Sequence, residues 1–168
     1  MQRLRAAGYT DLTGIDVSAP AIELAVARGV PNVSVMDGAA LEFATARFDV
    51  VIASDVLEHI EDEAKALSEW NRVLKPGGQL LVFVPAHAYL WSEHDVVNHH
   101  FRRYSRQGLV AALARAGLRV RRRLVLERGH VLPHGRAAGG PAPAFRVALL
   151  RNQARRYRRP APFCRPGQ

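Results

Sequence analysis

One segment of the sequence, residues 91–104, concentrates side chains that can do acid–base chemistry. It holds three histidines (His94, His99 and His100), two acids, two arginines and three aromatic residues. Imidazole titrates near neutral pH, so each histidine is a candidate general base. Long ordered loops in compact domains usually carry function, which favours a lid over a substrate. A structural loop and a metal site are the alternatives, but no fixed ligand spacing such as HExxH is present, so we predict no metal centre.

Acidic side chains also follow two short apolar segments. Asp16 lies near the end of the segment 12–17, where its carboxylate could accept two hydrogen bonds from a ribose diol. It could equally stabilise the dipole of the helix that follows. Asp37 and Gly38 come after the next apolar segment, where they could meet an adenine amino group or form an ordinary Asp–Gly turn.

The polar segment 54–59, SDVLEH, follows a third apolar segment directly. Ser54 and its neighbours would face any ligand that lies over the edge of the sheet. Asp55 or Glu58 could instead cap the next helix. His59 taken alone is more often a structural histidine than a base.

Alternating elements would position these residues. Short apolar segments predict buried parallel strands over 12–17, 33–36, 48–53 and 79–84, and 119–126 predicts an edge strand. Caps and apolar periodicity predict helices over 2–7, 19–28, 61–74 and 106–116. This alternation predicts an α/β fold with a mainly parallel sheet, in which ligands bind beyond the carboxyl ends of the strands.

The chain changes character near Glu127. Residues 1–118 hold 11 Lys and Arg against 14 Asp and Glu, whereas 119–168 hold 13 Arg against one acid. From 129 to 168, 26 of 40 residues are Gly, Ala, Pro or Arg, which predicts little burial. We therefore expect an α/β unit over 1–128 and a poorly ordered basic tail over 129–168, within which 145–157 could form a short amphipathic helix.

Composition excludes several classes of protein. With 48% hydrophobic and 23% charged residues, the chain should be globular rather than disordered. No apolar run approaches the ~18 residues of a membrane span, and no signal peptide is expected at the N-terminus. The single cysteine, Cys164, excludes an internal disulfide and a cysteine-cluster metal site, and it favours a cytoplasmic location.

Four motifs together resemble the class I S-adenosylmethionine-dependent methyltransferases. They are GIDVSAPAIELA at 14–25, VMDGAAL at 35–41, FDVVIASDVLEHIED at 48–62 and WNRVLKPGGQLLVFVPA at 70–86. The segment WSEHDVVNHHFRRYSRQGL at 91–109 looks like one bacterial subgroup of small-molecule methyltransferases. The resemblance implies a Rossmann-like fold, S-adenosylmethionine as cofactor, a small-molecule methyl acceptor and no specific nucleic-acid partner.

The resemblance also implies roles for single residues. Asp16 would bind the ribose hydroxyls and Val17 would pack on the adenine. Asp37 and Gly38 would face the adenine amino group, and Ser54 would lie by the methionine end. His94, His99 and His100 are the candidate bases if the acceptor must lose a proton.

The chain departs from the family at its start. The family's first strand and glycine-rich loop, which cradles the methionine part of the cofactor, precede the first helix and have no counterpart here. That strand is central in the family's sheet, so the strands expected at 12–17 and 48–53 would lack a neighbour. We expect an incomplete methyltransferase fold with little methyl transfer by this chain alone. The alternative is a non-catalytic remnant whose basic tail binds anionic partners through charge.

Overall fold

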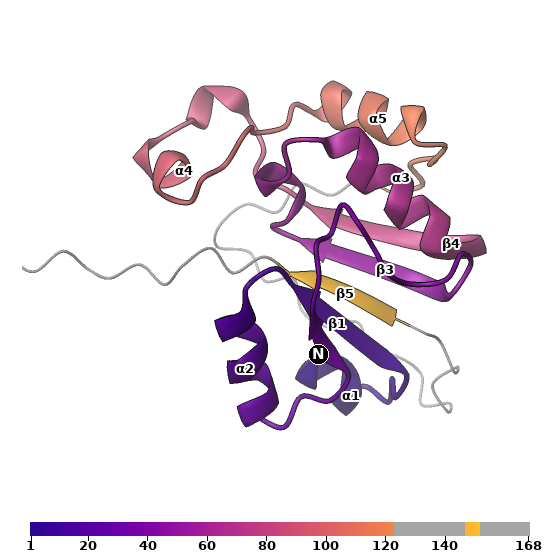
Figure 1. The fold of residues 1–168 in the computed structure, drawn as a ribbon. Helices are drawn as coiled ribbons and strands as arrows, with labels where there is room; N and C mark the ends of the chain where they lie inside the picture. The colour runs from indigo at the N-terminus through magenta and orange to yellow at the C-terminus, as the bar shows by residue number, and fades with distance from the viewer. Residues whose placement is uncertain (123–146, 152–168) are drawn as a thin grey trace, which may run out of the picture.

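A five-stranded parallel sheet forms the centre of the protein in a computed structural model, which describes residues 1–122 and the strand 147–151. The strands lie in the order β2-β1-β5-β3-β4, and every pair of neighbours runs parallel (Figure 1). Their bounds are β1 Leu12–Asp16, β2 Val33–Val35, β3 Phe48–Ser54, β4 Leu74–Phe83 and β5 Val147–Arg151. The predicted α/β fold with a parallel sheet is confirmed.

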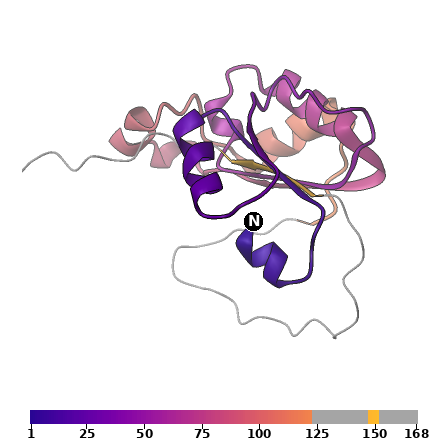
Figure 2. The ribbon, with the colours of Figure 1, turned by 60° about the horizontal axis from the view of Figure 1, so that its bottom comes forward.

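Helices flank this sheet, and side-chain caps mark where three of them begin. Ser18, Asp62 and Ser105 each accept a hydrogen bond from a backbone N–H in the first turn of α2, α3 and α5. Figure 2 shows the sheet nearly edge-on, with α1 and α3 on opposite sides. The helices are α1 Gln2–Ala6, α2 Ala19–Ala27, α3 Glu63–Val73, α4 Glu93–Val97 and α5 Arg106–Arg115, with short 3₁₀ turns η1 Leu57–His59 and η2 Ala88–Leu90.

The hydrophobic core lies between α3 and the sheet. Helical spacing places Ala66, Leu67, Trp70 and Val73 on one face of α3, and all four are buried. They belong to one cluster with Phe48 and other apolar residues of the sheet and its loops. The spacing in the sequence predicts a face of Ala64, Leu67, Trp70 or Asn71, and Leu74. Leu67 and Trp70 lie on the buried face as predicted, whereas Ala64 and Asn71 are exposed.

The segment Lys75-Pro76-Gly77-Gly78 lies inside β4 rather than before it. Sequence analysis expects this strand to begin at residue 79, but pairing with β3 begins at Leu74 and continues after a register shift. A Cβ on Gly78 would lie 2.9 Å from the carbonyl oxygen of Lys75, so only glycine fits this irregularity. The pattern predicts the end of α3 at Leu74, one residue beyond its observed end at Val73, and it misses the bulged start of the strand.

The centre of the sheet differs from the expectation. β5 pairs with β1 on one side and with β3 on the other, so these strands do not lack a neighbour. Two parallel strands with open inner edges can accept one more strand by backbone hydrogen bonds alone. The amphipathic helix considered for 145–157 is therefore wrong over Val147–Arg151, which forms this strand.

The far end of the chain allows only partial comparison with the predictions. Residues 119–122, the start of the predicted edge strand, form no strand, and 123–126 lie outside the described residues. The boundary at residue 128 and the order of the tail stay predictions, because most of 129–168 also lies outside them. Within residues 1–122, no helix is long and apolar enough to cross a membrane.

Candidate functional site

The carboxyl end of β1 carries Asp16, the acid that is best placed for contact with a ligand at this edge of the sheet. Asp16 is the last residue of β1 and is buried. Its Oδ1 accepts a hydrogen bond from the backbone N–H of Ser18 at 2.8 Å, close to the start of α2. The next residue, Val17, is 58% exposed. The geometry is compatible with both interpretations of Asp16, since a carboxylate has capacity for further hydrogen bonds.

Asp37 and Gly38 form a turn that the core holds in place. Oδ1 of Asp37 accepts a hydrogen bond from the N–H of Ala39 at 2.8 Å, the geometry of an Asx turn. The indole N–H of Trp70 donates to the carbonyl oxygen of Gly38 at 2.9 Å. This buried indole fixes the loop after β2 against α3, so the position of Asp37 is well defined.

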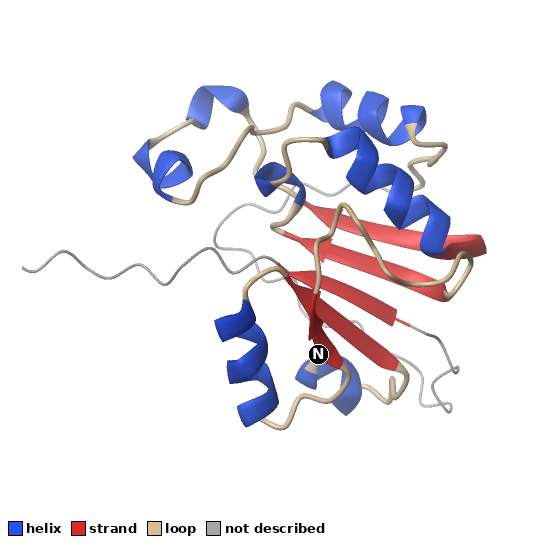
Figure 3. Ribbon diagram, in the orientation of Figure 1, coloured by secondary structure: helices blue, strands red, loops and turns tan. Residues whose placement is uncertain are grey.

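The carboxyl end of β3 lies beside that of β4. Ser54 ends β3, and its hydroxyl donates to Oδ2 of Asp55 at 3.1 Å. Asp55 adopts a left-handed backbone conformation, with φ of 54°, and its N–H donates to the carbonyl oxygen of Phe83. In Figure 3 the loops that leave these strands run out at the same end of the sheet.

Beyond this end of the sheet lies the histidine-rich segment, which contains α4 (Figure 1). This segment is organised around one buried carboxylate, Asp95. Asp95 is fully buried in α4 and accepts hydrogen bonds from Arg103 Nε and from the backbone N–H of Ser92, each at 2.8 Å. His100 Nδ1 also lies 2.8 Å from Asp95 Oδ1. The bond from Arg103 is the largest cause that lowers the pKa of Asp95 far below its usual range.

Neither α4 nor the role of Asp95 is predicted from the sequence above. The signal was present, because Ser92 and Asp95 have the S-x-x-D spacing of a capping box, and both of its hydrogen bonds form. The predicted loop is therefore partly helical. The C-terminal end of the segment 91–104 is also fixed, since the Tyr104 hydroxyl donates to Glu63 Oε2 at 3.0 Å.

The three candidate histidines lie in different environments. His94 and His99 are exposed, whereas the side chain of His100 is only 10% exposed. The centroids of the His94 and His100 rings are 6.5 Å apart, and the His59 ring lies perpendicular to His100 at 4.6 Å. The structure thus adds His59, which sequence analysis treated as structural, to this group.

Glu58 completes this group of side chains. It does not cap α3, because Asp62 is the N-cap residue of that helix. Its carboxyl group is buried, and Oε2 has no hydrogen-bond partner among the described residues. Burial raises the pKa of Glu58 to about 7. Burial also lowers the pKa of His59, and the nearby His100 lowers it further. Ligand atoms of Glu58, His59 and His100 all lie within 4.8 Å of one another.

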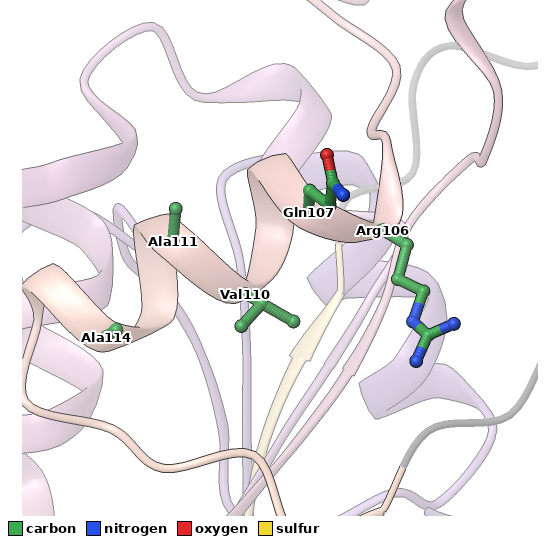
Figure 4. A pocket seen from close by; sticks show the side chains of 5 residues that line it. All are labelled: Arg106, Gln107, Val110, Ala111 and Ala114. Atoms are coloured by element: carbon green, nitrogen blue, oxygen red, sulfur yellow. The ribbon is translucent and has the colours of Figure 1, made fainter.

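Apolar side chains accompany this polar group at the surface. Large exposed hydrophobic residues gather in the same stretch of chain, namely Tyr89, Leu90, Trp91, Val96, Val97 and Phe101. A hollow elsewhere, on α5, is lined by Arg106, Gln107, Val110, Ala111 and Ala114 (Figure 4). None of these lining residues is a candidate from the sequence, so the hollow does not guide the assignment of function.

Comparison with known proteins relates the chain to methyltransferases. Residues 1–82 match the family model described as "Methyltransferase domain". A curated relative from Bos taurus, "Probable tRNA methyltransferase 9B", is 36% identical over 93 residues, which are 54% of this chain and 19% of that protein. Demethylmenaquinone methyltransferase from Staphylococcus aureus is 38% identical over 82 residues, 46% of this chain and 34% of that protein.

A solved structure agrees with these relatives. Phosphoethanolamine N-methyltransferase 2 from Haemonchus contortus, in complex with phosphomonomethylethanolamine and S-adenosylhomocysteine, superposes with a TM-score of 0.57 at 26% identity. The match covers 69% of this chain and 30% of that one. The chain therefore spans about a fifth to a third of the length of these relatives.

Proposed function

Because the chain carries part of a class I S-adenosylmethionine-dependent methyltransferase domain, we propose that it binds this cofactor and supports methyl transfer to a small-molecule acceptor. The observation that carries the proposal is the buried carboxylate of Asp16 at the carboxyl end of β1. Ligands of open parallel sheets bind at this end, and an acid at a strand tip suits a ribose diol.

The residues present fit the adenosine half of the cofactor. Asp16 would accept hydrogen bonds from the ribose hydroxyls, and the exposed face of Val17 would pack on the adenine. Asp37 and Gly38, held by Trp70, would border the adenine amino group. No described segment corresponds to the glycine-rich loop of the family, so only Ser54 is proposed for the methionine end.

The cofactor supplies a methyl group on a sulfonium sulfur, which is already activated for displacement. The chain then has to hold the acceptor in line with that methyl and keep water away. The segment 86–104 is suited to this task as a lid, since Asp95 and Tyr104 fix its shape beyond the strand ends. His94, His99 and His100 are the proposed bases for an acceptor that must lose a proton.

Two features support a small acceptor. Residues 1–118 carry more acids than bases, which is unfavourable for a nucleic-acid backbone. Exposed apolar side chains on the segment 89–101 would suit an acceptor with an apolar part. A cytoplasmic location remains a prediction that rests on the single cysteine.

A nucleic-acid acceptor is the second candidate. It is favoured by the relative whose name is "Probable tRNA methyltransferase 9B" and by the 13 arginines of residues 119–168. These arginines would attract any polyanion, so binding without methyl transfer is the non-catalytic alternative.

The test of the proposal is Asp16→Ala, assayed by calorimetric titration with S-adenosylhomocysteine. Loss of charge-assisted hydrogen bonds should weaken binding by ~1.5–3 kcal/mol, roughly 10- to 150-fold. The matched control is Glu23→Ala, which removes an exposed acid from α2 and should leave affinity unchanged. Equal affinity of Asp16→Ala and the parent would exclude the ribose assignment.

A further inference from the structure

A carboxylate and two imidazoles join the end of β3 to the histidine-rich segment. Glu58 and His59 lie in η1, and His100 follows α4, yet ligand atoms of all three come within 4.8 Å of one another. Glu58 is 1% exposed, and its Oε2 has no partner in the described part of the chain. Although the sequence predicts no metal centre, we propose that Glu58, His59 and His100 bind one divalent transition-metal ion, with Zn²⁺ as the test case.

The His100 imidazole is oriented as metal-binding histidines are. A carboxylate only accepts hydrogen bonds, so Nδ1 of His100 carries the proton in its 2.8 Å contact with Asp95, and in the neutral imidazole Nε2 then has the lone pair that a metal requires. Metal-binding histidines almost always have their second nitrogen held by a carboxylate or carbonyl group in this way. The His59 ring lies perpendicular to the His100 ring, with the two ring centroids 4.6 Å apart.

The donor set selects the class of ion. Two imidazoles and one carboxylate suit Zn²⁺, which takes three protein ligands and one water in an open tetrahedral site. Ca²⁺ and Mg²⁺ prefer oxygen ligands alone. In a tetrahedral site with bonds of ~2.0 Å the ligand atoms lie roughly 3.3 Å apart. Separations of up to 4.8 Å would therefore close by about 1.5 Å or less through side-chain movement.

The ion would also have a structural consequence. It would tie η1, directly after β3, to the segment that Asp95 organises, and so hold that segment over the strand ends. The charge of Arg103 does not oppose the ion strongly, because Arg103 is paired with Asp95 at 2.8 Å. As a metal ligand, His100 would not serve as the base, which leaves His94 and His99 for that role. The inference does not depend on the proposed methyl transfer.

The test is titration of the full chain with Zn²⁺ in competition with a chromogenic chelator. Every protein carries Cys164→Ser, so that the thiol cannot capture the metal. We expect one ion per chain, with affinity reduced at least about 100-fold in Glu58→Gln and in His100→Asn. Asp95→Asn acts through His100 and should reduce affinity about 10- to 100-fold. The control His87→Asn removes an exposed imidazole outside the cluster and should bind as the parent does.

Cobalt provides a second readout of the same site. Co²⁺ should give the parent the visible absorption of a low-coordinate nitrogen and oxygen site, and His100→Asn should lose it. Circular dichroism checks that each variant is folded, and Glu58→Gln preserves the shape of the side chain. Lack of saturable one-to-one binding by the parent would overturn the proposal. Ligand variants that bind Zn²⁺ as tightly as the parent would overturn it as well.

Discussion

A single buried carboxylate, Asp95, organises a segment that otherwise has little core of its own. It accepts hydrogen bonds from Ser92 and Arg103 and contacts His100, so it joins the start of α4 to the chain after it. A buried charge is tolerated only when it is paired and hydrogen-bonded, and here both conditions are met. The orientation of His100 therefore depends on Asp95.

Removal of this carboxylate should destabilise the protein strongly. Asp95→Ala leaves Arg103 largely buried without its partner, which costs about 3–5 kcal/mol. The measurement is urea unfolding in the presence of a chelator, so that bound metal does not contribute. The matched control is Glu93→Ala, an exposed acid in the same helix. Similar unfolding midpoints for the two variants would show that Asp95 does not hold the segment.

At the scale of elements, the most consequential feature is the central strand β5. It is the last of the described strands and pairs with both β1 and β3, which are otherwise not neighbours. Without it, each of these strands would present an open edge beside the candidate cofactor residues. The relative position of Asp16 and Ser54 therefore depends on a strand from the part of the chain where we expected a tail.

Proline in β5 should destabilise the whole sheet. Leu149 pairs with Gly14 on one side and Ile52 on the other, and Leu149→Pro removes a ladder N–H and clashes in a central strand. We expect a loss of about 3 kcal/mol and a lower thermal midpoint.

The matched control for this prediction is Val35→Pro in the edge strand β2. At the ends of this strand the N–H of Met36 donates to the carbonyl oxygen of Asp16, and the carbonyl oxygen of Asn32 accepts from the N–H of Gly14. Because successive residues of a strand direct their backbone groups to opposite sides, the N–H of Val35 points away from the sheet. Val35→Pro should therefore cost less than Leu149→Pro. Equal midpoints for Leu149→Pro and the parent would show that β5 does not support the sheet.

The molecule as a whole has a divided charge. Residues 1–118 have a surplus of three acids, 14 against 11, while residues 119–168 have a surplus of twelve bases, 13 against 1. Long-range attraction of a polyanion would thus come from residues 119–168. Such attraction does not depend on the base sequence of a nucleic acid.

RNA binding by the full chain should therefore be weak and salt-dependent. If six or more phosphates are neutralised, affinity should fall about 1,000-fold or more between roughly 50 and 200 mM salt. Replacement of Arg155, Arg156, Arg158 and Arg159 by glutamine should reduce the salt slope, whereas Arg3→Gln with Arg5→Gln should not. Fluorescence anisotropy with labelled tRNA measures both. Salt-insensitive binding to tRNA, with methyl transfer to it, would instead favour the nucleic-acid acceptor.

Much of the sheet edge could be predicted from the sequence, because the signals involved are local. Ser18 and Ser105 mark where two helices begin, and both caps form as expected, whereas α3 is capped by Asp62 rather than by Asp55 or Glu58. Asp16 and Ser54 lie at strand ends for the same reason. Periodicity and capping act within a few residues, so a short window of sequence contains them.

Long-range contacts were decided only by the tertiary structure. β5 lies between β1 and β3 because their backbone edges accept a parallel strand, and backbone hydrogen bonds carry no sequence signature. Glu58 and His59 meet His100 because β3 and β4 end at the same side of the sheet. The turn after β3 and the segment after β4 therefore leave the sheet side by side. Residues so far apart in the chain become neighbours only when the sheet has formed. The assembly of this cluster is therefore a property of the fold and not of any one segment.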